Sequence, residues 1–293
     1  MGIDRIAVTG GNGKIGEAIL EDLDTHGYHT VNVARGSQRE EVSDEYRRTD
    51  LLDAGQVYGS LAASEADAVV HMGTVNRPTR SSGHVCYESN VMSSWNVLEA
   101  ATELGLEAVV LPSSINVMGA AYQEAPTYVE SLPVDEDHPL TPRDPYAISK
   151  EAIERAGAGV GRMPEAPQVA ALRYPWVATR EDQREEFVEQ DRSLDGLDDA
   201  WHHTTRDVVF SYLDIDDGAA IARRAVEADF DGFEAFWAVA GDTTASAPSA
   251  DIAEKYFPEA EIRGSLTGRE SLISTDKAAE LLDWTPQNSW TDI

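Results

Sequence analysis

Short apolar runs alternate with segments of helical periodicity over the first 180 residues. The runs lie at residues 5–8, 30–34, 68–71, 108–111 and 169–172, with a weaker one at 45–49. Between them, segments such as 90–104 and 145–158 carry apolar residues three or four positions apart, which predicts amphipathic helices. Strands that alternate with helices predict an α/β fold built on a doubly wound parallel sheet with right-handed crossovers.

The alternating pattern loosens in the last 40% of the chain, where residues 178–207 are polar, acidic and irregular. The elements expected after them are a helix at 216–228, a strand at 235–239 and short helices near 249–257 and 275–282. We therefore expect a sheet domain over residues 1–177 and a smaller lobe over 178–293. This lobe would cap the carboxyl edge of the sheet and be interleaved with it through the strand near 235–239.

A glycine-rich turn joins the first strand to the first helix. Gly10, Gly13 and Gly16 permit a tight turn, a close approach of phosphates and close contact between helix and strand. Lys14 and Ile15 open the helix, so backbone N–H groups and the positive helix end point to one place, which suits a pyrophosphate. The turn predicts a dinucleotide site, whereas an ordinary strand–helix turn is the alternative for the glycines alone.

A tyrosine, a lysine and a serine form the candidate catalytic group. Tyr146 and Lys150 are four positions apart, so on a helix they share one face. A nearby ammonium lowers the pKa of a tyrosine, and the phenolate could take a proton from a substrate hydroxyl. Ser114 follows a predicted strand at the sheet edge where α/β proteins bind ligands, and could hydrogen-bond the same oxygen. A chance surface pair and a turn-capping serine are the alternatives.

The charge of the chain is strongly acidic. Its 293 residues include 53 acidic and 23 basic ones, of which four are lysines, for a net charge of −30. This balance is typical of proteins from a salt-loaded cytosol, where screening makes the repulsion tolerable, so we expect a halophilic source. Because the chain has no basic stripe, we expect no nucleic-acid partner.

Composition also bears on location and on metal binding. No apolar run approaches the roughly 20 residues of a membrane span, and a signal-peptide pattern is absent, so we expect a cytoplasmic protein. Cys86 is the only cysteine, which excludes an intrachain disulfide and a thiolate cluster. His202 and His203 are adjacent, point apart and have no ligand cluster near them in sequence, so we expect no metal site.

Taken together, the motifs resemble those of the extended short-chain dehydrogenases/reductases. The glycine turn, Ser-Ile-Asn-Val-Met-Gly at 114–119, the Tyr-x-x-x-Lys pair and Leu-Arg-Tyr-Pro at 172–175 follow that family's order and spacing. Leu-Leu-Asp-Trp-Thr-Pro at 281–286 is similar to its carboxyl-terminal motif. The resemblance implies a Rossmann fold, with the serine, tyrosine and lysine of the candidate group as the catalytic triad.

The resemblance also implies which residues contact a nicotinamide dinucleotide. They are Gly10, Gly13, Lys14, Ile15, Gly16, Arg35, Asp50, Leu51, Met72, Gly73, Asn90, Tyr146, Lys150 and Tyr174. Where many members carry an aspartate that binds the ribose 2′-hydroxyl, this chain has Ala34, followed by Arg35. The change favours a 2′-phosphate, and hence NADP as the preferred cofactor, with NAD as the alternative. Arg35 could instead simply face solvent.

The substrate residues depart from the pattern of nucleotide-sugar enzymes. Tyr-Pro-Trp at 174–176 stands where those enzymes have Tyr-Phe-Asn, which weakens the case for a nucleotide-sugar. Asn116 could bind a sugar hydroxyl, and Trp176 could offer an apolar face to a sugar ring. Arg206 matches an arginine that binds phosphates in nucleotide-sugar enzymes and substrate in uronate dehydrogenases, with a surface ion pair as the alternative.

The chain is therefore expected to be an NADP-preferring oxidoreductase that acts on a sugar. The specific prediction is oxidation of a free or phosphorylated aldose or uronate at C1 to the lactone, with Tyr146 as general base. A nucleotide-sugar 4-epimerase or dehydratase is the alternative, and a non-catalytic NADP-sensing regulator is a second one. Because the helices at 90–104 and 145–158 pack between subunits in this family, the resemblance also implies a homodimer or homotetramer.

Overall fold

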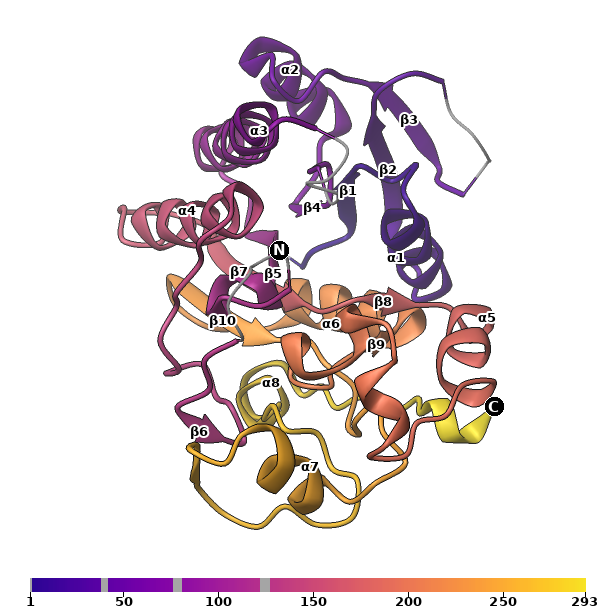
Figure 1. The fold of residues 1–293 in the computed structure, drawn as a ribbon. Helices are drawn as coiled ribbons and strands as arrows, with labels where there is room; N and C mark the ends of the chain where they lie inside the picture. The colour runs from indigo at the N-terminus through magenta and orange to yellow at the C-terminus, as the bar shows by residue number, and fades with distance from the viewer. Residues whose placement is uncertain (1, 38–41, 76–80, 122–126) are drawn as a thin grey trace.

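A parallel sheet forms the centre of the molecule (Figure 1). The computed structural model describes residues 2–37, 42–75, 81–121 and 127–293. Within these ranges the sheet strands are β1 (Arg5–Thr9), β2 (His29–Ala34), β3 (Glu45–Arg48), β4 (Ala68–His71), β5 (Ala108–Ser114), β7 (Gln168–Tyr174) and β10 (Phe233–Trp237). Their order, β10-β7-β5-β4-β1-β2-β3, confirms the predicted doubly wound parallel sheet. The strand order reverses between β1 and β4, the place where such sheets bind ligands.

Helices cover both faces of this sheet (Figure 1). One face carries α1 (Lys14–Thr25), α6 (Ile215–Glu227) and α8 (Asp276–Leu282), and the other carries α2 (Ala54–Ser64), α3 (Gly83–Leu104) and α4 (Pro145–Val160). Side chains alternate along each strand, so Ile6 and Val8 of β1 pack toward α1 and α6 while Ala7 packs toward the other layer. Burial on both faces explains why central strands such as β4 and β5 are largely apolar in sequence.

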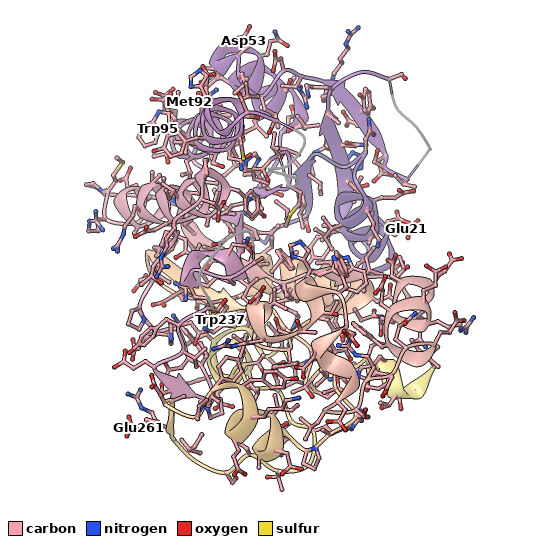
Figure 2. All side chains as sticks on the ribbon, in the orientation of Figure 1. Glu21, Asp53, Met92, Trp95, Trp237 and Glu261 are labelled. Carbon is pink, nitrogen blue, oxygen red and sulfur yellow. The ribbon has the colours of Figure 1, made fainter. Side chains whose placement is uncertain are left out.

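A second core lies beyond the carboxyl ends of β5 and β10. It draws on Val117, which follows β5, on Phe210, on Ile252 of α7 (Ser249–Tyr256) and on Trp237, which ends β10 (Figure 2). The smaller elements of this half are β6 (Ser131–Leu132), β8 (Val177–Ala178), α5 (Arg180–Gln183), β9 (Leu213–Asp214) and β11 (Glu261–Ile262). Because β10 and α6 belong to the sheet layers, the carboxyl-terminal half is interleaved with the first half.

Three elements differ from the sequence pattern. The helix expected to begin at residue 90 begins at Gly83, because Ser82 caps it by accepting from the N–H of Val85. The pattern does not predict α2, which buries only Val57, Leu61 and Ser64. Residues 178–207 contain α5 and short helical turns rather than irregular chain alone. No helix among the described residues is long and apolar enough to cross a membrane.

Candidate active site

The glycine turn after β1, called the glycine cradle below, packs so closely against its own backbone and that of Gly73 that it has little room for side chains. Gly10 has a φ of +71°, and a Cβ there would lie 2.8 Å from the Cα of Gly73. A Cβ on Gly16 would lie 2.4 Å from the carbonyl oxygen of Gly10, and one on Gly13 would lie 3.2 Å from it. Gly13 is also the N-cap of α1, and no side chain caps this helix end. The bare helix end therefore suits a pyrophosphate, as the sequence predicts.

One cleft of about 1170 Å³ runs along the carboxyl ends of the central strands. It contains most of the predicted site residues: Gly10, Gly13, Lys14, Ile15, Arg35, Asp50, Leu51, Met72, Gly73, Ser114, Asn116, Tyr146, Lys150, Tyr174 and Trp176. Gly16, Asn90 and Arg206 do not line it. The cleft thus brings the glycine turn and the catalytic candidates together at the reversal of strand order.

Local structure fixes the catalytic candidates at this edge. Ser114 is the last residue of β5, and its hydroxyl donates to Asn116 Oδ1 and accepts from Asn116 N, at 3.2 Å each. Tyr146 is the second residue of α4, where Asp144 caps the helix by accepting from Tyr146 N at 2.9 Å. Lys150 lies one turn further, with its Nζ 5.4 Å from the centre of the Tyr146 ring.

Lys150 is almost completely buried. Its Nζ donates to the carbonyl oxygen of Pro112 at 2.6 Å and to Thr74 Oγ1 at 3.0 Å. Burial lowers the pKa of Lys150 to about 7, because removal from water disfavours the charged form. Two fixed acceptors therefore hold the amine between β5 and the segment that follows β4.

A buried ion pair fastens α4 to the sheet. Glu154, one turn after Lys150, accepts from Arg173 Nε and Nη2 of β7 at 2.9 Å each and from Ser113 Oγ of β5 at 2.5 Å. The guanidinium of Arg173 also lies over the Trp237 ring, 4.6 Å from its centre. Because Ser113 precedes the catalytic candidate on β5, the network fixes that strand relative to the helix that carries the tyrosine.

A chain of buried hydrogen bonds joins β1, β4 and α3 beneath the cleft. Ser94 Oγ donates to the Asn90 carbonyl at 2.8 Å, so it must accept from His71 Nε2, which lies 3.1 Å away. His71 Nδ1 then accepts from Thr9 Oγ1 at 2.6 Å, and that oxygen accepts from Gly73 N at 3.2 Å. Burial lowers the pKa of His71 to about 3, so the neutral ring fits both bonds. The chain holds the backbone that lines the cleft.

Asn90 supports the same backbone from behind. Its side chain accepts from Val75 N at 2.7 Å and donates to Val75 O at 3.1 Å and to Ser149 Oγ at 3.0 Å. Val75 lines the cleft, whereas Asn90 is fully buried. The structure therefore places Asn90 as a support of the predicted cofactor site rather than in its lining.

The end of β2 carries the residues predicted to select the dinucleotide. Arg35 is exposed, lines the cleft and makes no ion pair with any residue in the described ranges. The last residue of β2 is Ala34, which is buried and carries no carboxylate. Lys14, at the start of α1, pairs with Asp182 of α5, which links the glycine turn to the smaller lobe.

Part of the cleft lining is aromatic. Trp176, Trp201 and His203 line the cleft together with Val208. The sequence prediction included Trp176 but missed the other two, although aromatic rings within the polar segment 178–207 were the available signal. Asn116 is 5% exposed, and its Nδ2 has no hydrogen-bond partner among the described residues.

Two further sequence predictions concern Arg206 and metal binding. Arg206 is half-buried outside the cleft lining, and its Nε has no hydrogen-bond partner in the described part of the chain. A search of residues 2–37, 42–75, 81–121 and 127–293 finds no cluster of three potential metal ligands.

Known proteins share this fold and sequence pattern. UDP-glucose 4-epimerase 2 of Oryza sativa subsp. japonica is 26% identical over 194 residues, which are 59% of this chain and 44% of that protein. The chain spans about half the length of several curated relatives that it matches. Among solved structures, a mutated uronate dehydrogenase is 20% identical, with a TM-score of 0.69 over 99% of this chain and 84% of that one.

A structure of MoeE5 in complex with UDP-glucuronic acid and NAD is also similar in fold. It is 19% identical, with a TM-score of 0.69 over 98% of this chain and 99% of that chain. The sequence model of the NAD dependent epimerase/dehydratase family matches residues 6–236, which include the glycine turn, the serine, and the tyrosine–lysine pair. The chain therefore belongs to the NAD dependent epimerase/dehydratase family.

Proposed function

We propose that this enzyme oxidises a free or phosphorylated aldose or uronate at C1 to the lactone. The observation that carries the proposal is one cleft that contains the glycine cradle, Ser114, Tyr146 and Lys150. A hydroxyl group held beside Tyr146 can lose its proton there, while the carbon that bears it loses a hydride. The intact catalytic group also favours an enzyme over a non-catalytic regulator that senses NADP.

The glycine turn fits a dinucleotide, because its backbone lines the cleft and Gly13, the N-cap of α1, makes no side-chain capping bond. When bound, a nicotinamide dinucleotide supplies the acceptor for the hydride from the sugar carbon. Arg35 supports a preference for NADP, since its guanidinium lines the cleft and makes no ion pair with a described residue.

Each catalytic residue has a separate task in the proposed reaction. Ser114 orients the reacting oxygen through its hydroxyl, whose position Asn116 fixes. Tyr146 accepts the hydroxyl proton through its phenolic oxygen, and Lys150 in its charged form stabilises the phenolate. Two of the three ammonium hydrogens bind Pro112 O and Thr74 Oγ1, which leaves one for the tyrosine or a ribose hydroxyl.

A nucleotide-sugar 4-epimerase is the second candidate, and the UDP-glucose 4-epimerases among the relatives favour it. It would share the first half-reaction and then return the hydride to the opposite face of the sugar. Trp176 supports the dehydrogenase instead, because it lines the cleft where nucleotide-sugar enzymes carry an asparagine.

Turnover of two substrate panels separates these candidates. Purified enzyme in molar KCl is given free sugars or UDP-sugars with NADP or NAD, and the absorbance of the reduced cofactor is followed. Net reduction with a free sugar supports the dehydrogenase, whereas conversion of a UDP-sugar without net reduction refutes it. Tyr146→Phe should lower kcat at least about 100-fold with little change in cofactor affinity, since the ring remains. Near wild-type turnover would refute the role of Tyr146.

We also propose that the protein is a homodimer in which α3 and α4 pack between subunits. Met92 of α3 is 43% exposed and Ile148 of α4 is 40% exposed, and Met92 and Trp95 lie on the outer side of α3 (Figure 2). Exposed apolar side chains on neighbouring helices favour such an interface. Light scattering that gives the mass of one chain would refute the dimer.

A further inference from the structure

Five aromatic rings form a row from the carboxyl-terminal segment to the cleft. The ring centres are 5.9 Å apart between Trp290 and Phe187, 5.9 Å between Phe187 and Trp176, and 5.1 Å between Trp176 and Trp201. His203 follows, 5.0 Å from Trp201. The three contacts that begin at Phe187 and end at His203 are edge-to-face, the geometry that aromatic quadrupoles favour. The row therefore couples segments that are far apart in sequence.

The inner end of the row is firmly held. Phe187 is 1% exposed, and its ring also packs against Tyr212 at 5.1 Å. Trp290 donates from its Nε1 to Thr243 O at 2.9 Å and from its backbone to Tyr212 Oη at 3.0 Å. Tyr212 in turn donates to Asp242 at 2.7 Å. These bonds fix the base against which Trp176 packs.

The outer end of the row faces the cleft. Trp201 is 40% exposed, although it contacts both Trp176 and His203, and all three line the same cleft as Ser114. A large apolar ring that stays exposed inside a concave site offers surface for a ligand to cover. Because the row is supported from behind, this surface is preorganised for a rigid ligand.

The catalytic residues restrict what that ligand can be. Tyr146 and Ser114 act on a hydroxyl and line the same cleft as Trp201, so a ligand that reaches all three carries a hydroxyl group and an apolar face. A pyranose ring has both, because its axial C–H bonds form an apolar, slightly positive face that complements the negative face of an indole. We propose that Trp201 binds the C–H face of a pyranose substrate, and that Trp290 positions Trp201 through Phe187 and Trp176. This inference rests on the proposed sugar substrate.

Substitutions at Trp201 test the binding role. For whichever sugar or UDP-sugar the wild type converts, Trp201→Leu should raise KM about tenfold or more, with kcat and dinucleotide Kd nearly unchanged. Trp201→Phe keeps an aromatic face and should stay within about threefold of the wild-type KM. Tyr58→Leu is the matched control, because Tyr58 on α2 is 41% exposed, about as exposed as Trp201, and lies outside the cleft.

Trp290 tests the support that the row provides. Trp290→Leu should raise the sugar KM by a smaller factor, while Trp290→Phe should restore it. Dinucleotide Kd, followed by fluorescence of the reduced cofactor, should not change in either variant. If Trp290 only stabilised the fold, Trp290→Leu would lower the melting temperature and would weaken the binding of the sugar and of the dinucleotide together.

The possible outcomes separate this inference from the proposed function. If a free sugar is oxidised but Trp201→Leu has the wild-type KM, the binding role is refuted and the oxidoreductase assignment stands. If Trp201→Leu weakens the binding of UDP as much as the binding of a UDP-sugar, Trp201 contacts the nucleobase and the pyranose assignment is wrong. If the wild type neither binds nor converts any sugar or UDP-sugar, both proposals fail.

Discussion

Replacement of Lys150 by methionine should change the stability of the protein by an amount that depends on pH, and should abolish its activity. The amine is 2% exposed, and burial lowers its pKa from 10.5 to about 7. Between these two values the unfolded chain binds more protons than the folded one, so wild-type stability rises with pH across that window. Methionine has a similar length and no charge, so it removes the cost of burying the ammonium.

The size of the effect follows from the two pKa values. A group with a pKa of 10.5 unfolded and about 7 folded lowers the free energy of unfolding by about 4 kcal/mol at pH 7 and about 2 kcal/mol at pH 9. The substitution also loses the bonds to Pro112 O and Thr74 Oγ1, a loss that does not depend on pH. The loss of these bonds offsets much of the gain at pH 7, so the testable quantity is the pH dependence: the stability of the variant relative to the wild type should fall by about 2 kcal/mol from pH 7 to pH 9.

Urea unfolding of both proteins at pH 7, 8 and 9 measures this difference. Titrating groups that do not interact with Lys150 are common to the two proteins, so their contributions cancel, whereas the charge of Lys150 also acts on His71 and Cys86. A stability difference that stays constant with pH would refute the lowered pKa of Lys150. In the same samples the variant should bind the dinucleotide more weakly, because the amine that we assign to the ribose is gone.

Three other changes have predictable results. Thr9→Val leaves His71 Nδ1 and Gly73 N without partners, so it should cost about 2–4 kcal/mol and weaken dinucleotide binding. Thr30→Val, which removes a buried hydroxyl near the amino end of β2, should leave the dinucleotide Kd unchanged, and an equal effect of both variants on that Kd would contradict the supporting role of Thr9. NADP should be preferred about tenfold in kcat/KM, and the double change of Ala34 to Asp and Arg35 to Ala should reverse the order; a wild-type preference for NAD would refute the role of the arginine. The melting temperature should rise as KCl increases from about 0.1 to 1 M, because screening relieves the repulsion of 30 net negative charges; an unchanged value would count against a salt-adapted protein.

Local patterns in the sequence predict most of the sheet and the position of the candidate catalytic group at its edge. Buried parallel strands are apolar on both faces, so each of them is visible as a run such as 108–111. Tyr146 and Lys150 are predictable because a helix turns once between them, and the glycine spacing shows where a backbone must approach another closely. The computed structure confirms the parallel doubly wound sheet that these patterns predict.

Features that depend on contacts between distant segments were not predictable. His71 and Thr9 are 62 positions apart and meet only because β1 and β4 pair in that register. Asn90 was expected in the cofactor site, but the length and orientation of α3 place it behind the lining. Trp201 lies among short helical turns without a period, so only the folded chain shows that it reaches the cleft.

Transfer of a deuterium label from the sugar to the cofactor tests the central claim most directly. An aldose or uronate deuterated at C1 is incubated with the enzyme and excess NADP or NAD, and the reduced cofactor and the sugar product are analysed by mass spectrometry. Oxidation at C1 predicts that the deuterium moves to the nicotinamide, that the lactone contains none, and that Tyr146→Phe abolishes the transfer. A parallel incubation uses a UDP-sugar deuterated at C1. A change of its configuration at C4, with the label still at C1 and no net reduction of the cofactor, would contradict the account.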